Sequence, residues 1–269
     1  MIESLQGLIG QVRYFDEGTL SKSFEQVGYP LAASRVLFFG EEHTDIVSQI
    51  ETLGAINAIA KPGDTILLEG GDRATPIERH CGFYLLLSLY INWQWEKLGE
   101  PYSVGSVRKK MEWQKEQGFG RTFIDTKRSY NISDLNISRI SCGFWDSDQA
   151  IKETFNKNEV TKDTLLKRNT SMVEAIKMAL ARDTGRALVI SGFMHLPTFD
   201  YLDTKRLNKE KSDFPESMQR YYELVREARN KPQSSFKMDS SSGTTEPIFK
   251  YLTENNIPFR EFIHRRLER

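Results

Sequence analysis

Two segments of the sequence end in the same pattern, a run of β-branched or aromatic residues followed by Gly-x-x-His. The first, RVLFFGEEH, ends at His43, and the second, RALVISGFMH, ends at His195. Each run is typical of a buried strand, and the glycine at its end, Gly40 or Gly192, lets the chain turn sharply. Open α/β sheets bind ligands at the carboxyl ends of their strands. Because two of only four histidines occupy this repeated position, we expect an active site there.

His43 also begins a predicted helix. The positive end of a helix dipole favours neutral imidazole, which can act as a general base or bind a metal. Either Glu41 or Glu42 can orient the ring. We assign Glu42 to the catalytic set and Glu41 to substrate binding; the alternative is a solvent-exposed turn.

A carboxylate ends the next buried strand. Glu69 closes TILLEGG, and a charge there is costly unless it is paired, coordinated or exposed at the sheet end. Together, His43, Glu69 and His195 are a three-ligand set for a divalent metal such as Mn²⁺, Co²⁺ or Zn²⁺, with an open position for water. In the metal-free alternative, Glu69 is a base or orients a histidine; otherwise it caps a turn. We favour the metal-free site, because Gly-x-x-His lacks the fixed ligand pair of HExxH.

A predicted helix, LLKRNTSMVEAI, supplies a cation. Its Arg168 can point to the sheet end, where a guanidinium would pair with Glu69 or clamp an oxyanion or carboxylate. Asn169 is assigned to substrate binding. The alternative for Arg168 is a solvated charge on the outer helix face.

Three further residue types follow the predicted strands. Trp145 and Asp146 come after a strand and are expected to line the same edge, unless they are a packed indole and a helix N-cap. His80 follows Glu69 along the chain and is expected to reach the pocket. His264, in HRRLER, has the setting of a solvated tail.

A layered sheet is needed to bring these residues together. Strand-like runs occupy 35–40, 65–69, 138–144 and 186–191, with shorter ones at 122–125 and 258–263, and helical patterns occupy 44–60, 77–98, 147–155, 161–183, 215–230 and 247–255. The alternation predicts a single α/β domain of three layers, with a central, mostly parallel sheet and helices on both faces. Within 1–269 we expect a helical lead-in (1–34), a motif-bearing core (35–200), and C-terminal helices with an edge strand (201–269).

Composition excludes several classes of partner. The 37 basic and 37 acidic residues balance, so no net field favours nucleic acid. The longest apolar stretch, 83–93, is about a dozen residues and too short for an integral membrane segment. The cysteines, Cys81 and Cys142, form no CxxC, so neither a disulfide scaffold nor a structural zinc site is expected, and a reducing, cytosol-like compartment fits best. With no signal peptide at the start, we expect a cytoplasmic protein, or an effector exported by another route.

Four short motifs, taken in order, resemble those of a known superfamily. GEEH (40–43), LLEGG (67–71), RNTSMVEAI (168–176) and GFMH (192–195) are similar to the TIKI/TraB–ChaN–erythromycin esterase proteins. The resemblance covers 35–200 and implies Gly40, His43, Glu69, Arg168, Gly192 and His195 as matched positions. It also implies three activities: metal-dependent proteolysis, metal-free ester hydrolysis with a histidine base, and haem binding. Related domains occur in bacterial toxins.

The leading expectation is a hydrolase that cleaves an ester, amide or peptide bond in a small-molecule or peptide substrate. One alternative is a ChaN-like protein that binds haem or iron, suggested by the aromatic-rich helix at 83–95. The other is an effector or toxin module that keeps the fold while its ancestral site has decayed.

Overall fold

The computed structural model of the chain describes residues 4–41, 45–69, 82–98, 134–157, 161–182, 185–192, 195–197 and 244–265, together with Lys109, Trp113 and Glu116. None of the helices in these ranges has the length and apolar character that a membrane span requires. The predicted elements at 122–125 and 215–230 lie outside the described residues.

A six-stranded sheet forms the centre of the described structure, in the order β1-β6-β2-β5-β3-β4. Its strands are β1 (Phe24–Gly28), β2 (Val36–Glu41), β3 (Thr65–Leu68), β4 (Ser141–Phe144), β5 (Ala187–Gly192) and β6 (Phe259–His264). Strands β2 to β6 are parallel, and β1 runs antiparallel to β6. The predicted mostly parallel sheet is therefore confirmed.

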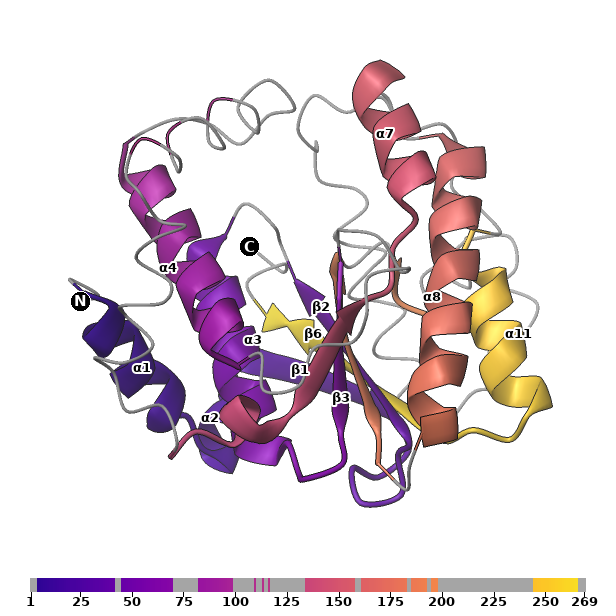
Figure 1. Cartoon of the computed structure of the whole chain (residues 1–269). Helices are drawn as coiled ribbons and strands as arrows, with labels where there is room; N and C mark the ends of the chain where they lie inside the picture. Colours follow the sequence, from indigo (N-terminus) through magenta and orange to yellow (C-terminus); the bar gives the residue numbers. More distant parts are fainter. Residues whose placement is uncertain are drawn as a thin grey trace.

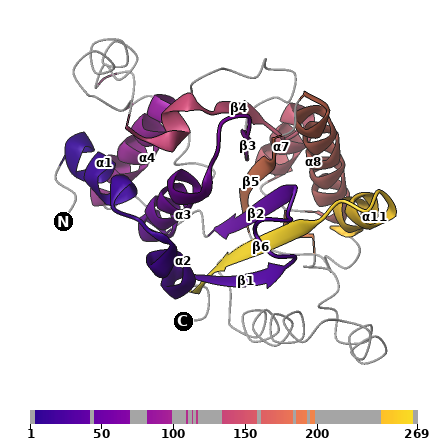
Figure 2. The ribbon, with the colours of Figure 1, turned by 90° about the horizontal axis from the view of Figure 1, so that it is seen from below.

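Helices cover both faces of this sheet, as the alternating pattern predicts (Figure 1). One face carries α1 (Leu5–Arg13), α2 (Glu17–Ser23), α3 (Ile46–Ile59), α4 (Gly82–Lys97) and the 3-10 turn η1 (Asn136–Arg139). The other face carries α7 (Asp148–Lys157), α8 (Lys162–Arg182) and α11 (Glu246–Glu254). Figure 2 shows the two layers on either side of the strands.

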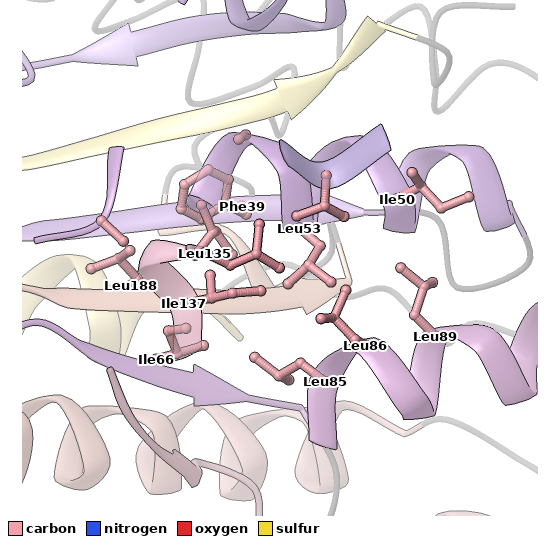
Figure 3. Packing of buried hydrophobic residues seen from close by; sticks show 14 of the residues in the cluster. Phe39, Ile50, Leu53, Ile66, Leu85, Leu86, Leu89, Leu135, Ile137 and Leu188 are labelled. Atoms are coloured by element: carbon pink, nitrogen blue, oxygen red, sulfur yellow. The ribbon is translucent and has the colours of Figure 1, made fainter. Parts of the chain in front are cut away.

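Two apolar clusters, one on each face, hold the layers together. Alternation along β2 sends Phe39 to the α3 side and Phe38 to the α8 side. Phe39 stacks on Phe262 of β6, with ring centroids 4.7 Å apart. Figure 3 shows leucines of α3 and α4 packed toward the strands on the first face. The sheet is thus buried on both sides, which is typical of parallel sheets.

Two strands differ from the sequence prediction. Residues 1–34 contain α1 and α2, as expected of a helical lead-in, but also β1, which forms the edge of the described sheet. Only Phe24 and Val27 of β1 are buried, with two polar residues between them, so no alternating pattern marks the strand. Strand β6, predicted at the edge, lies between β1 and β2 instead.

The prediction of a solvated tail at His264 is wrong. The side chain is buried at the end of β6, and its Nε2 bonds the carboxylate of Glu51 on α3. Its ring also meets Phe24 edge-on, with centroids 5.1 Å apart. The strand continues to residue 264, so the histidine belongs to the sheet rather than to the basic residues that follow.

Cys142 is disulfide-bonded, which the spacing of the two cysteines did not indicate. The residue lies in β4, beside Ile66 of β3. The one other cysteine of the sequence, Cys81, lies outside the described residues. The spacing argument failed because it tested only for CxxC, whereas a disulfide needs proximity in space and not in sequence.

A buried ion pair joins the starts of β3 and β5, at the amino edge of the sheet. Asp64 accepts hydrogen bonds from the backbone N–H, Nε and Nη2 of Arg186, at 3.0, 3.2 and 2.7 Å. Nη2 also donates to the carbonyl of Ile59 at 2.7 Å. This pair fixes the two strands that carry functional candidates at their opposite ends.

Candidate functional site

The carboxyl ends of neighbouring strands bring the candidate residues into one row. In the register of the sheet, Gly40 of β2 lies beside Ser191 of β5. Glu69 directly follows β3, and Trp145 directly follows β4, where its backbone N–H bonds the Leu68 carbonyl at 3.0 Å. Parallel strands end at a common edge, so side chains from distant parts of the chain converge there.

Arg168 of α8 lies between two carboxylates at this edge. Its Nη2 donates to Glu69 Oε1 at 2.5 Å and to Asp146 Oδ2 at 2.6 Å, and its Nε donates to both Asp146 oxygens at 3.0 Å. The Asp146 side chain is completely buried, and the side chains of Arg168 and Glu69 are 13% and 14% exposed. The predicted pairing of Arg168 with Glu69 is confirmed, and a solvated helix charge is excluded.

The electrostatics of this triad are set by burial and by charge together. Burial raises the pKa of Asp146 above its ordinary value, although the hydrogen bonds and charge of Arg168 oppose this shift. Burial alone would lower the pKa of Arg168, but the charges of Glu69 and Asp146 outweigh it and raise that pKa. Arg168 is therefore a fixed cation, while Asp146 is a carboxyl group whose charged form is disfavoured.

Glu69 connects the triad to β5 and to His195. Its Oε2 accepts a hydrogen bond of 2.6 Å from the backbone N–H of Gly192, and its Oε1 lies 3.7 Å from Nε2 of His195. The expectation that a histidine and a carboxylate from separate segments converge at one sheet edge is confirmed for this pair. The second histidine, His43, lies outside the described residues, as do Glu42 and His80.

Asn169 determines which nitrogen of His195 carries the proton. The Asn169 amide Nδ2 donates to the carbonyl of Thr244 at 2.8 Å, so its Oδ1 is the atom that faces His195 Nδ1, at 2.5 Å. An amide oxygen can only accept, so Nδ1 of His195 is protonated. Nε2, the nitrogen that faces Glu69, then has the lone pair in the neutral ring.

Trp145 forms the wall behind this histidine. The two rings meet edge to face, with centroids 5.2 Å apart, and the guanidinium of Arg168 lies 5.8 Å from the indole ring. The indole N–H donates to the carbonyl of Ile190 in β5 at 2.9 Å. Trp145 was expected to bind substrate or to pack; it is buried, and it restricts the positions of His195 and Arg168.

Gly40 lies within β2, which continues to Glu41, and it approaches Leu196 closely. The residues after Glu41, where the predicted turn would complete, lie outside the described ranges. A Cβ at Gly40 would lie 2.9 Å from Cδ1 of Leu196, the neighbour of His195. The absent side chain makes room for the segment that carries the histidine.

Two residues that the sequence assigned to substrate binding contact other side chains of the cluster instead. Asp146, expected to bind substrate, instead bonds Arg168, and Asn169, also assigned to substrate, orients His195. Glu41 is half-buried at the end of β2, in register with Gly192. Sequence reasoning missed Thr244, because a backbone carbonyl leaves no signature in a residue pattern.

The predicted metal ligands are described only in part, because His43 lies outside the described residues. Within the described ranges, no group of three His, Cys, Asp or Glu residues could hold an ion. One described contact disfavours a divalent metal on Glu69. The carboxylate oxygen that faces His195 bonds the guanidinium of Arg168 at 2.5 Å, and this cation would repel a metal bound to the same oxygen.

No family model, curated protein or solved structure matches the chain.

Proposed function

We propose that this protein is a hydrolase of ester or amide bonds, in a small-molecule or peptide substrate, with His195 as the general base. One observation carries the proposal: Asn169 holds His195 in the tautomer that presents Nε2 beside Glu69, at the carboxyl edge of a parallel sheet. A base whose other nitrogen is oriented by a fixed partner is the arrangement that general-base catalysis requires.

The reaction begins with a proton transfer. Nε2 of His195 takes a proton from water, and the water oxygen attacks the carbonyl carbon of the substrate. When Glu69 and Asp146 are both ionised, their two negative charges exceed the one positive charge of Arg168. The imidazolium that forms on His195 then brings the net charge of the four groups to zero. The carbonyl oxygen becomes an oxyanion, and its collapse expels the leaving group, which takes the proton back from Nε2.

Arg168 stabilises the developing oxyanion. Its hydrogen bonds to Glu69 and Asp146 use Nε and Nη2. The N–H groups of Nη1, which bond none of the described residues, are then the donors for the oxyanion. Because the guanidinium is already held between two carboxylates, it does not have to be ordered when the substrate binds.

The cluster also supports the resemblance to the TIKI/TraB–ChaN–erythromycin esterase proteins. Glu69, Arg168, Gly192 and His195 are matched positions, and they make contact through Glu69. Among the family activities, the esterase-like chemistry without a metal suits this donor set. The aromatic content of α4 no longer favours haem, because Leu85, Leu86 and Leu89 direct that helix into the core.

The disulfide of Cys142 bears on where the protein acts. Disulfides persist in oxidising compartments and are rare in the cytosol. The bond therefore favours the exported alternative over the cytoplasmic one.

A direct assay tests the proposed reaction. The substrates are 4-nitrophenyl acetate and fluorescein-labelled casein, and the variants are His195→Gln and, as a matched control, His264→Gln. We expect His195→Gln to lower kcat/KM by about 100-fold or more, while His264→Gln keeps the activity. Equal activity in the His195→Gln variant would refute the role of His195. Loss of activity with a chelator, restored by Mn²⁺, Co²⁺ or Zn²⁺, would refute the metal-free mechanism.

A further inference from the structure

One buried hydroxyl in the site row has no hydrogen-bond partner. Ser191 of β5 is fully buried, and its Oγ forms no hydrogen bond with any of the described residues. Buried polar groups without partners are rare in folded proteins, because the lost hydration is not replaced. Alanine at this position would remove that cost, so the hydroxyl requires an explanation other than stability.

The location of Ser191 connects it to Glu69. Successive side chains of β5 alternate between faces, so Ser191 shares the α8 face with Val189, which lies opposite Leu67 of β3. Ser191 lies two residues after Val189, and Glu69 lies two residues after Leu67, so Ser191 and Glu69 are at adjacent positions. The backbone N–H that follows Ser191, that of Gly192, already donates to the Glu69 carboxylate at 2.6 Å. The hydroxyl is thus close to a carboxylate that it does not bond.

The distance between Glu69 and His195 suggests a role for the Ser191 hydroxyl. Nε2 of His195 is 3.7 Å from Oε1, which is longer than a hydrogen bond. Once Nε2 carries a proton it becomes a charged donor, and the carboxylate must move by about 1 Å to accept it at hydrogen-bond distance. Such a shift changes which donors reach Glu69.

We propose that Ser191 is a positioning residue that donates a hydrogen bond to Glu69 when His195 is protonated. The hydroxyl rotates about χ1 toward the moved carboxylate, and no covalent bond is made or broken. Among the described residues, the charged groups of this cluster are Glu69, which faces His195, and Arg168 and Asp146, which are linked to Glu69 through the guanidinium. Ser191 therefore stabilises the proton-bearing state of the base, which occurs after substrate has bound. This proposal rests on the proposed role of His195 as the base.

The test compares Ser191→Ala with Ser48→Ala. Ser48, on α3 at the opposite face of the sheet, has another buried hydroxyl without a partner. Both variants should raise Tm by about 2 °C, because each removes an unsatisfied polar group. Only Ser191→Ala should lower kcat for 4-nitrophenyl acetate, by about threefold and with KM unchanged.

A second measurement does not depend on turnover. The ¹⁵N resonances of His195 report its protonation during a pH titration of the full chain. Loss of the Ser191 hydroxyl should shift the midpoint of that titration to lower pH by about half a unit, whereas Ser48→Ala leaves it unchanged. An unchanged midpoint in Ser191→Ala overturns the positioning role even if the wild-type protein hydrolyses esters. If the midpoint shifts but neither substrate is turned over, the proposed hydrolase fails and the link between Ser191 and His195 stands. A lower Tm in Ser191→Ala would instead make the hydroxyl structural and overturn the proposal.

Discussion

The carboxylate of Glu69 bonds the backbone N–H of Gly192 at 2.6 Å, beyond the last paired residues of β3 and β5. The register between these strands ends at Leu67 and Val189. The Glu69 side chain therefore links the two strands beyond the point where their backbone pairing ends. This contact ties Gly192, at the end of the strand that leads to the proposed base His195, to the carboxylate after β3.

Substitution of Glu69 should separate its charge from its role as an acceptor. Glu69→Gln keeps an oxygen for the Gly192 N–H and leaves Asp146 to neutralise Arg168, so we expect a loss of about 1–2 kcal/mol in unfolding free energy. Glu69→Ala also leaves the N–H unpaired and should lose more. Both variants should lower kcat for ester hydrolysis. Urea unfolding and the 4-nitrophenyl acetate assay measure the two effects, and equal stability of the variants would contradict this assignment.

The two buried arginines offer a matched comparison. Arg168→Met leaves Glu69 and Asp146 buried without their cation, and Arg186→Met leaves Asp64 in the same condition. Each variant should lose about 3–5 kcal/mol of stability, because an unpaired buried charge remains.

Only Arg168→Met should also lose turnover per folded molecule, since Arg186 lies at the opposite edge of the sheet. The rate per molecule of folded protein, measured at a temperature where both variants are folded, distinguishes the two. Loss of activity in Arg186→Met would show that the site is not independent of the amino edge.

The raised pKa of Asp146 predicts the direction of a pH effect on stability. Burial raises this pKa above the ordinary value of 3.8, so the folded state holds the proton more tightly than the unfolded state does. The contribution of Asp146 to stability is then fully present below the unfolded pKa and declines as pH rises through the folded pKa. The stability advantage of the wild type over Asp146→Asn should therefore shrink with increasing pH. Urea titrations across the acidic range test this, and an advantage that grows with pH would mean that Arg168 outweighs burial.

Asn169 is expected to matter through the tautomer of His195. Asn169→Ala removes both the acceptor for Nδ1–H and the donor to Thr244, and should cost about 2–3 kcal/mol. Asn169→Asp keeps the acceptor but places an oxygen against the Thr244 carbonyl. The ¹⁵N spectrum of His195 should show a protonated Nδ1 in the wild type and a mixture of tautomers in Asn169→Ala. A wild-type ring protonated at Nε2 would contradict the orientation derived from Thr244.

The packing of Gly40 predicts a rescue. Gly40→Ala places a methyl group 2.9 Å from Leu196 and should displace the neighbouring His195, which lowers kcat. Leu196→Ala in the same chain removes the clash, so the double variant should recover activity relative to Gly40→Ala alone. A double-mutant cycle on kcat/KM quantifies the coupling. Additive losses would show that Gly40 serves another purpose.

The sequence was sufficient for the residues that end strands. Glu69 and His195 each follow an apolar run, and the common edge of parallel strands places such residues together without further information. The prediction for Arg168 required one more step, which was to pair the carboxylate of Glu69 with the nearest cation on a helix. Both inferences use charges and periodicity, which are visible in a single sequence.

Other parts of the site depend on packing and could not be predicted. The Asp146 carboxyl looks like a helix cap until the distance to Arg168 is known. Gly40 suggested a turn, but nothing in the sequence indicated its close approach to Leu196, because the two residues are far apart in the chain. Strand β1 and the burial of His264 were missed because polar neighbours hide the pattern of their apolar contacts.

The insertion of β5 between β2 and β3 has a consequence for how the molecule is made. During synthesis, the first half of the chain leaves the ribosome with β2 and β3 lacking the strand that belongs between them. Residues 187–192 must emerge before this gap can close, so assembly of the sheet awaits pairings between distant segments, which slow folding. The same strand leads into His195. A chain that ends before residue 195 therefore lacks the proposed base, and the proposed site cannot form before the centre of the sheet has closed.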